Sequence, residues 1–227
     1  MATTTLDLLK RLRHRLDDSG GNSLDVNEWL TDDSLCHWSN VELLDYLASA
    51  EHEFCTRRPI RDYAEIQLFA GEADYELPDT TYTVEEVRLR SKNIELKPFD
   101  HHHELGLRNW NERHPAWYAI DLRELEIRFY PSPEEIDYVD LRIFRFPEQR
   151  LSLSVDPEIP EAYRHHLLDW ASYLAYRKDN SEVADYDRSS QFRIRFEEFV
   201  GHPVPVAHQE ILRSVANRRL RTRLYYR

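Results

Sequence analysis

The chain has 227 residues, of which 41% are hydrophobic and 32% are charged, and its net charge at pH 7 is −12. This length allows one large or two small domains with a real core, and only five glycines and 11 prolines exclude a fibrous or wholly disordered chain. The negative charge argues against general DNA binding, no stretch approaches the ~20 apolar residues of a membrane span, and two cysteines exclude a disulfide framework.

Residues 1–38 are predicted to be an N-terminal leader that contains one short helix. The segment from about Thr5 to Asp17 places leucines near helical spacing, with lysine and arginine between them. Asp18 to Ser23 contains two glycines and is predicted to be flexible. A basic amphipathic helix could touch a membrane. Because its apolar face is short, we expect instead an arm that packs on a neighbour or on its own body.

A second helix is predicted over residues 39–58. Ser39 and Glu42 have the spacing of a capping box, and Pro59 would end the helix. Cys55 is expected to be a small buried hydrophobe, because no nearby motif supplies a base that would make it a nucleophile. The apolar stripe is predicted to consist of Val41, Leu44, Leu47, Ala48, Ala50, Phe54 and Cys55.

Between residues 60 and 147 the hydrophobic period changes to two, which predicts an antiparallel β insertion. Its centre is a hairpin over residues 117–130 that turns at Arg123-Glu124. The strand Tyr138–Phe146 alternates cleanly, with Val139, Leu141 and Ile143 on one face. The other expected strands are Glu65–Ala70, Tyr75–Leu77, Val84–Arg90 and Ile94–Pro98. The residues expected to pack the β unit are Trp117, Ile120, Leu125, Ile127 and Phe129.

After Pro147 the helical period returns, with helices predicted over residues 160–178, 183–200 and 205–217. The predicted fold class is therefore α+β: a small helical bundle with an inserted antiparallel β unit and an extended C-terminal arm. In this organisation the leader covers residues 1–38, the core covers 39–217, and a basic docking arm covers 218–227.

Histidines form the most conspicuous candidate for metal chemistry. His101, His102 and His103 are consecutive and His114 follows, but adjacent side chains diverge and no Cys pair or helical His-x-x-x-His accompanies them. We therefore expect a solvated loop and no metal site. No nucleophile elbow, P-loop or GxGxxG motif occurs, so we expect no catalytic residue and no cofactor. His166 is expected to be a hydrogen-bonded residue at the edge of the core.

The C-terminal arm is the best candidate for a functional site. The last 17 residues contain six arginines and no acidic residue, which leaves a charge of −18 on the other 210 residues. A merely solubilising tail would not need leucine and tyrosine anchors, and arginine recognises carboxylates through planar bidentate contacts. The predicted docking residues are Arg218, Arg219, Leu220, Arg221, Arg223, Leu224, Tyr225, Tyr226 and Arg227. Basic residues interleaved with aromatic ones could also stack on nucleic-acid bases.

The hairpin and the segments after it resemble a known protein family over roughly residues 39–177. A Pro-x-x-Tyr strand, a short turn and a strand that closes on Tyr-Pro-x-Pro are followed by another strand and a helix led by proline. This pattern is similar to the head-to-tail adaptor, or connector, proteins of short-tailed bacteriophages. The matching residues are Pro115, Tyr118, Tyr130, Pro131 and Pro133, then residues 138–147, and then Pro160 with Tyr163.

The resemblance implies a structural virion protein without enzymatic activity. It implies a dodecameric ring in the neck of the virion, made in the host cytoplasm, that joins the portal protein to a nozzle or tail-tube protein. The arm would insert against the portal, the β part would face the tail, and viral DNA would pass through the lumen without sequence-specific binding. Two alternatives stay open: a metal-dependent or cell-wall hydrolase that uses His101 to His114, and a small nucleic-acid-binding module that uses the C-terminal tail.

Overall fold

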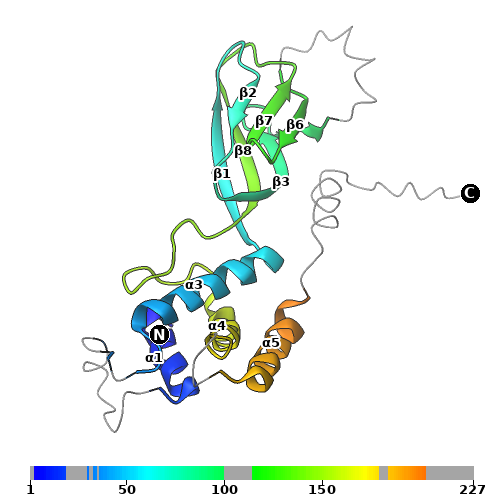
Figure 1. Ribbon diagram of the computed structural model, residues 1–227. Coiled ribbons are helices and arrows are strands. Elements are labelled where there is room, and N and C mark those ends of the chain that lie inside the picture. The colour runs from blue at the N-terminus through cyan, green and yellow to red at the C-terminus, as the bar shows by residue number, and fades with distance from the viewer. Residues whose placement is uncertain are drawn as a thin grey trace, which may run out of the picture. The chain divides into compact units, whose positions relative to one another are not determined.

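The computed structural model describes residues 3–18, 30, 33–34, 36–99, 114–178 and 184–202 (Figure 1). The described chain divides into two compact units. The helical unit contains the described residues up to Ile60 and from Phe146 to His202, and the β unit contains those between Arg61 and Arg145. The prediction of a mixed α+β fold with a β unit inserted into a helical bundle is confirmed. The helix predicted over 205–217 and the arm 218–227 lie outside the described residues.

Among the described residues, the helical unit contains four α-helices and one 3-10 helix. Capping boxes precede two of these helices: Thr4 with Asp7 before α1, and Ser39 with Glu42 before α3. The sequence predicted the second of these capping boxes. The predicted helix over 160–178 begins instead as a 3-10 helix after Pro160. The elements are α1 (Thr5–Leu16), α3 (Asn40–Arg57), η2 (Glu161–His166), α4 (Leu167–Ala175) and α5 (Tyr186–Val200).

One continuous hydrophobic core joins these helices. Cys55 is fully buried in it, as predicted. Val41, which was expected on the apolar stripe, is 68% exposed, so that prediction is wrong. The buried face of α3 passes through Leu43, and Val41 is two residues, or about 200° of helical turn, away from it. The central buried residues are Leu8, Leu9, Leu12, Leu16, Leu43, Leu47, Ala50, Phe54, Leu167, Ala171, Ala175, Phe196 and Val200.

The β unit contains two four-stranded sheets, with strand orders β1-β8-β3-β4 and β2-β7-β6-β5. All described pairings are antiparallel except β5 with β6, which is parallel and corrects the expectation of a purely antiparallel unit. The strands are β1 (Ile60–Leu68), β2 (Asp74–Glu76), β3 (Thr81–Leu89), β4 (Ile94–Glu95), β5 (Lys97–Pro98), β6 (Trp117–Asp121), β7 (Glu126–Tyr130) and β8 (Asp137–Arg145).

The β6–β7 hairpin supplies one side of the β-unit core. Ile127 and Phe129 are fully buried, and Ile120 and Leu125 pack against the same core, as predicted. Trp117 is not part of this core, so the prediction that it packs the β unit is wrong. Tyr118 occupies the inner face in its place and is 4% exposed. From the other sheet, Val139, Leu141 and Ile143 of β8 are buried on the face that their alternation predicted.

Candidate functional site

Two groups of predicted site residues lie outside the described residues: the arm from Arg218 to Arg227, and His101 to His103. Predictions about both therefore stay predictions. His114 is described, and it is partly buried just before β6. Among the described residues, no three His, Cys, Asp or Glu side chains lie together in a way that could hold a metal ion. None of the described helices is long and apolar enough to cross a bilayer.

The adjacent histidines His165 and His166 lie at the end of η2, and His166 packs at the edge of the helical core. The His166 ring stacks on Phe199, with 3.4 Å between ring centroids and 14° between planes. Its Nδ1 lies 3.7 Å from Oδ2 of Asp169. Burial, followed by the nearby His165, holds the pKa of His166 below its ordinary value. The neutral ring therefore serves packing.

Beside α1 lies a hollow of about 640 Å³, which we call the α1 surface. Arg15 is anchored there, because its Nη1 lies 2.6 Å from Oδ1 of Asp169. Neither Lys10 nor Arg11 forms an ion pair with another described residue. The residues that line the α1 surface are Lys10, Arg11, His14, Arg15, His165 and Leu168. Three of these six side chains are Lys or Arg, which suits an acidic partner.

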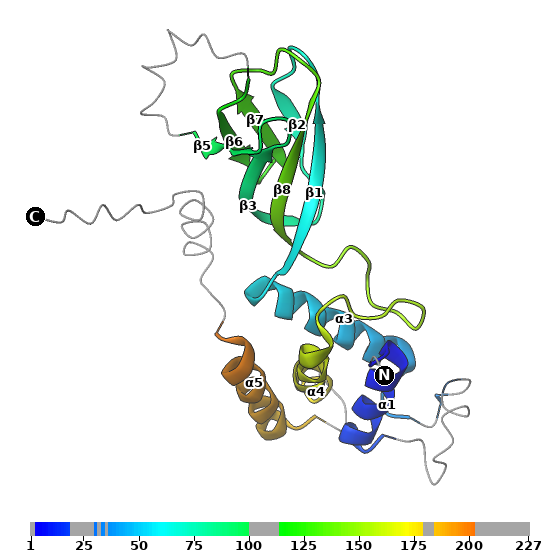
Figure 2. The same cartoon turned by 180° about the vertical axis from the view of Figure 1, so that it is seen from behind.

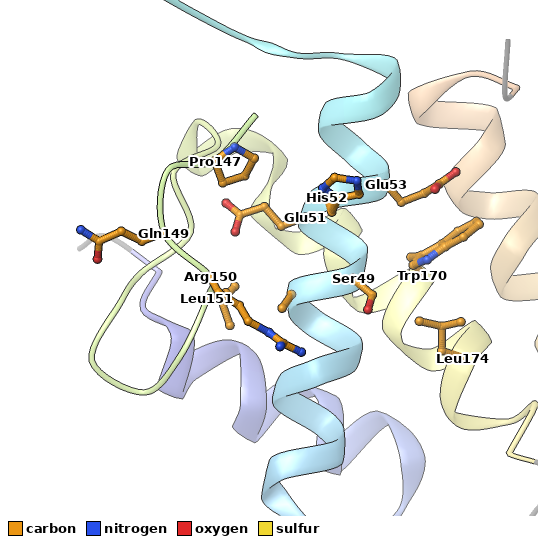
Figure 3. Close-up of a pocket in the computed structure, with 11 residues that line it drawn as sticks. Ser49, Glu51, His52, Glu53, Pro147, Gln149, Arg150, Leu151, Trp170 and Leu174 are labelled. Atoms are coloured by element: carbon orange, nitrogen blue, oxygen red, sulfur yellow. The ribbon is translucent and has the colours of Figure 1, made fainter. Parts of the chain in front are cut away.

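A second hollow of about 570 Å³, the α3 surface, lies on the outer side of α3 (Figure 3). It is lined by Ala48, Ser49, Glu51, His52 and Glu53 of α3, by Pro147, Gln149, Arg150 and Leu151, and by Trp170 and Leu174 of α4. In Figure 3 Glu51 extends toward the segment that carries Pro147, whereas Trp170 lies on the other side of α3. The α3 surface thus combines carboxylates with an aromatic ring.

Glu51 ties the two parts of the α3 surface together. Its side chain accepts hydrogen bonds from the backbone N–H of Glu158 at 2.7 Å and from that of Ile159 at 3.4 Å. Burial raises the pKa of Glu51, and the two N–H donors counteract part of this effect. At only 2% exposure, this carboxylate positions the 157–159 segment more than it presents charge to solvent.

Arg57 supports the aromatic side of the α3 surface. Its Nη2 lies 2.6 Å from Oε1 of Glu53, and its guanidinium carbon lies 5.3 Å from the ring centroid of Trp170 and 5.1 Å from that of Phe196. Asp45 and Arg150 form an exposed ion pair at 2.8 Å on the border of the same surface. These contacts fix the ring of Trp170 beside a row of carboxylates.

A buried polar cluster attaches the end of α1 to the start of α3. Arg13 and Asp18 are each 2% exposed, and their Nη1 and Oδ2 atoms lie 2.8 Å apart. Arg13 also donates to the Trp38 carbonyl at 3.0 Å and to Oδ1 of Asn40 at 2.7 Å. Asp18 accepts the N–H of His37 at 2.7 Å. Asp18 was expected to begin a flexible segment, and this buried position corrects that expectation.

The β unit carries a third hollow of about 430 Å³ on the outer face of its first sheet. Glu86 is 8% exposed and lies between two arginines, at 2.7 Å from Arg88 and 2.9 Å from Arg142. Arg90 pairs with both Glu65 and Asp140. Because positive and negative side chains neutralise one another here, this face offers little net charge to a partner.

The comparisons with known proteins agree with the sequence pattern. The family model described as SU10 adaptor protein matches residues 3–221. The match therefore includes α1, which the resemblance over 39–177 did not reach. A search of curated proteins found no match.

Proposed function

This chain belongs to the SU10 adaptor protein family, a family of phage head-to-tail adaptors, and we propose that it forms the ring that joins the portal to the tail. Membership makes it a structural adaptor protein of a bacteriophage, and it implies interactions with portal and tail proteins. The observation that carries the proposal is the extent of the match, which runs through the helical unit and the β unit and includes the first four residues of the arm 218–227.

In the proposed ring of twelve copies, the C-terminal arm docks on the portal. Six arginines in the last 17 residues favour an acidic surface. Exposed ion pairs contribute only ~0–1 kcal/mol each, so arginines alone would hold the arm weakly. Leu220, Leu224, Tyr225 and Tyr226 are therefore proposed to enter apolar pockets of the portal, as buried anchors do at other interfaces.

The β unit is proposed to face the nozzle or tail-tube protein, and the ring to surround the DNA passage in the neck of the virion. The net charge of −12 supports this arrangement, because a negative inner wall would repel DNA and limit its adhesion during passage. DNA would then pass without sequence-specific contacts.

The proposal is tested by deleting residues 218–227. The shortened protein is expected to keep its circular dichroism spectrum and melting temperature and to lose attachment to purified portal rings in electron microscopy. A matched control replaces only Leu220, Leu224, Tyr225 and Tyr226 with alanine, which keeps every arginine. This control should also lose most attachment if the anchors enter pockets. Normal docking of the shortened protein, or its failure to fold, would show that the segment is not a docking arm.

A further inference from the structure

The first sheet of the β unit has one long strand at its edge. In the order β1-β8-β3-β4, β1 is paired on one side only within the part of the chain that the structure describes, and Figures 1 and 2 show it on the outer side of β8. It has nine residues and no proline, whereas the other edge strands, β2, β4 and β5, have three, two and two residues. Because the open side of an edge strand can bind a further strand, proteins usually keep such edges short or protected. β1 is therefore the longest edge available to a partner strand in the described part of the chain.

Alternate residues of β1 direct their backbone groups toward this open side. The N–H of Tyr63 donates to Oδ1 of the adjacent Asp62 at 2.8 Å, so it is not used by β8. Successive N–H groups of a strand point to opposite sides, which places those of Arg61, Glu65 and Gln67 on the open side together with that of Tyr63. The ring of Tyr63 is 70% exposed. The open side therefore presents a regular row of backbone donors and acceptors around an exposed aromatic ring.

The charged side chains of β1 are already paired within the chain. Arg61 lies 2.8 Å from Glu85, and Glu65 pairs with Arg90. Attraction of a partner must therefore come mainly from the backbone groups of the edge. The charges still decide which residues can face one another across a new strand pair, because like charges directly opposite each other are destabilising.

We propose that β1 of one copy pairs antiparallel with β1 of a second copy, with the two Tyr63 residues opposite each other at a two-fold axis. In this register Arg61 of each copy lies opposite Glu65 of the other, and the backbone groups of these three residues can exchange the hydrogen bonds of an antiparallel ladder. On the other face of the strand, Ile60 lies opposite Ile66. Both isoleucines are only partly buried in one copy, so the pair also covers apolar surface.

The neighbouring registers fit less well. Moving the two-fold axis to Ala64 removes both pairs of opposite charge and places Asp62 opposite Ile66. Moving it to Glu65 places two carboxylates opposite each other. A register shift that keeps the faces of the strand therefore loses the complementarity of β1 with itself.

A second copy also explains how such an edge stays soluble. One two-fold contact uses the open edges of both copies, so the pair is closed and cannot grow into a fibre. The same closure means that this contact is not the repeating contact of the proposed ring. The pair therefore belongs to the free protein and separates before a ring forms, and the inference goes beyond the proposed function.

The first test places proline on the open edge. Tyr63→Pro removes an N–H that faces the edge and spares those directed at β8, so the variant should fold, which circular dichroism checks. Sedimentation equilibrium is expected to show a concentration-dependent dimer for full-length wild type and an association constant at least about tenfold lower for Tyr63→Pro. Gln67→Pro is the matched control. It faces the same edge but lies outside the paired residues 60–66, so it should dimerise like wild type.

The second test exchanges the charges that face each other. Arg61→Glu and Glu65→Arg each place like charges opposite one another, so each protein alone should associate at least about fivefold less well than wild type. An equal mixture of the two variants should recover the dimer, because every acidic residue then faces an arginine. A single protein that carries both changes should recover it for the same reason. These variants decide the question if Tyr63→Pro does not fold.

The inference is overturned if wild type stays monomeric at high concentration, or if a folded Tyr63→Pro protein dimerises as wild type does. It is also overturned if the two charge variants fail to recover the dimer when mixed. A dimer that appears only after residues 218–227 are deleted would show that the chain's own arm covers the edge. On purified portal, Tyr63→Pro should form rings as wild type does. Loss of rings by this folded variant would make β1 a contact between ring neighbours and would overturn the two-fold pair.

Discussion

The β unit and the helical unit are specified by different kinds of contact. The described part of the β unit lies within Arg61–Arg145, and its core consists of apolar residues that alternate along strands. The helical unit comes from two stretches joined by polar links, such as the Thr5 N–H that donates to Oδ1 of Asp156 at 2.8 Å. Arg164 likewise donates to the Thr3 carbonyl at 2.5 Å. Local alternation marks most of the core of the first unit, whereas the second unit depends on individual side chains that meet across the sequence.

The largest effect is expected in the core of the β unit. Phe129→Ala should lower the free energy of unfolding by about 3–5 kcal/mol, because its fully buried ring would leave a cavity between the two sheets. Urea denaturation followed by circular dichroism measures this loss. Tyr63→Ala is the matched control, since this ring is 70% exposed and its removal should change little. A loss under ~1 kcal/mol for Phe129→Ala would show that the strand register is wrong.

A loss of stability of similar size is expected when the buried Arg13–Asp18 pair of the helical unit is broken. Arg13→Ala should cost about 3–5 kcal/mol, because it leaves the buried carboxylate of Asp18 without its cation. Arg11→Ala, on the exposed side of the same helix, should be nearly neutral in the same urea titration. Replacing both partners, as Arg13→Met with Asp18→Leu, should recover a large part of the loss. Equal stability of Arg13→Ala and Arg11→Ala would contradict the role assigned to this buried pair.

These two units also show how far sequence alone leads. The alternation of Val139, Leu141 and Ile143 predicted their burial, because a two-residue period separates the faces of a strand. Trp117 was expected inside together with Ile120, although alternation puts these two residues on opposite faces of one strand, and period alone does not say which face is covered. Arg13 stands among leucines and other basic residues, and nothing local distinguishes it from a solvent-facing arginine. The pairing of β5 with β6 and the packing of α1 on α4 join segments distant in sequence, so no local pattern could predict them.

A smaller loss of stability is expected at the capping box before α3, which is a feature of the local sequence. The Ser39 side chain accepts the Glu42 N–H at 3.2 Å, and Glu42 in turn accepts the Ser39 N–H at 2.9 Å. Ser39→Ala should therefore destabilise the protein by about 1 kcal/mol. Ser39→Asp should retain most of the stability, because aspartate also caps helices well. Thermal unfolding of the three proteins checks this order, and equal melting temperatures would contradict the capping role.

The smallest effect is expected on the charged face of the β unit. Arg90 bridges Glu65 and Asp140, but about half of each side chain is exposed. Arg90→Ala should therefore leave the free energy of unfolding almost unchanged, with any difference disappearing at high salt. Urea titrations at low and high ionic strength measure the free energy of unfolding and its dependence on salt. A large, salt-independent loss would show that this surface network stabilises the β unit in the way that Arg13 stabilises the helical one.

The central claim is that this SU10-family chain joins portal to tail as a ring, and electron cryo-microscopy of the full-length protein bound to its purified portal tests it most directly. The account predicts a closed ring at one end of the portal, with residues 218–227 of each copy inserted between portal subunits. A chain that binds no portal, or that binds as isolated copies with the arm away from the portal, would contradict it.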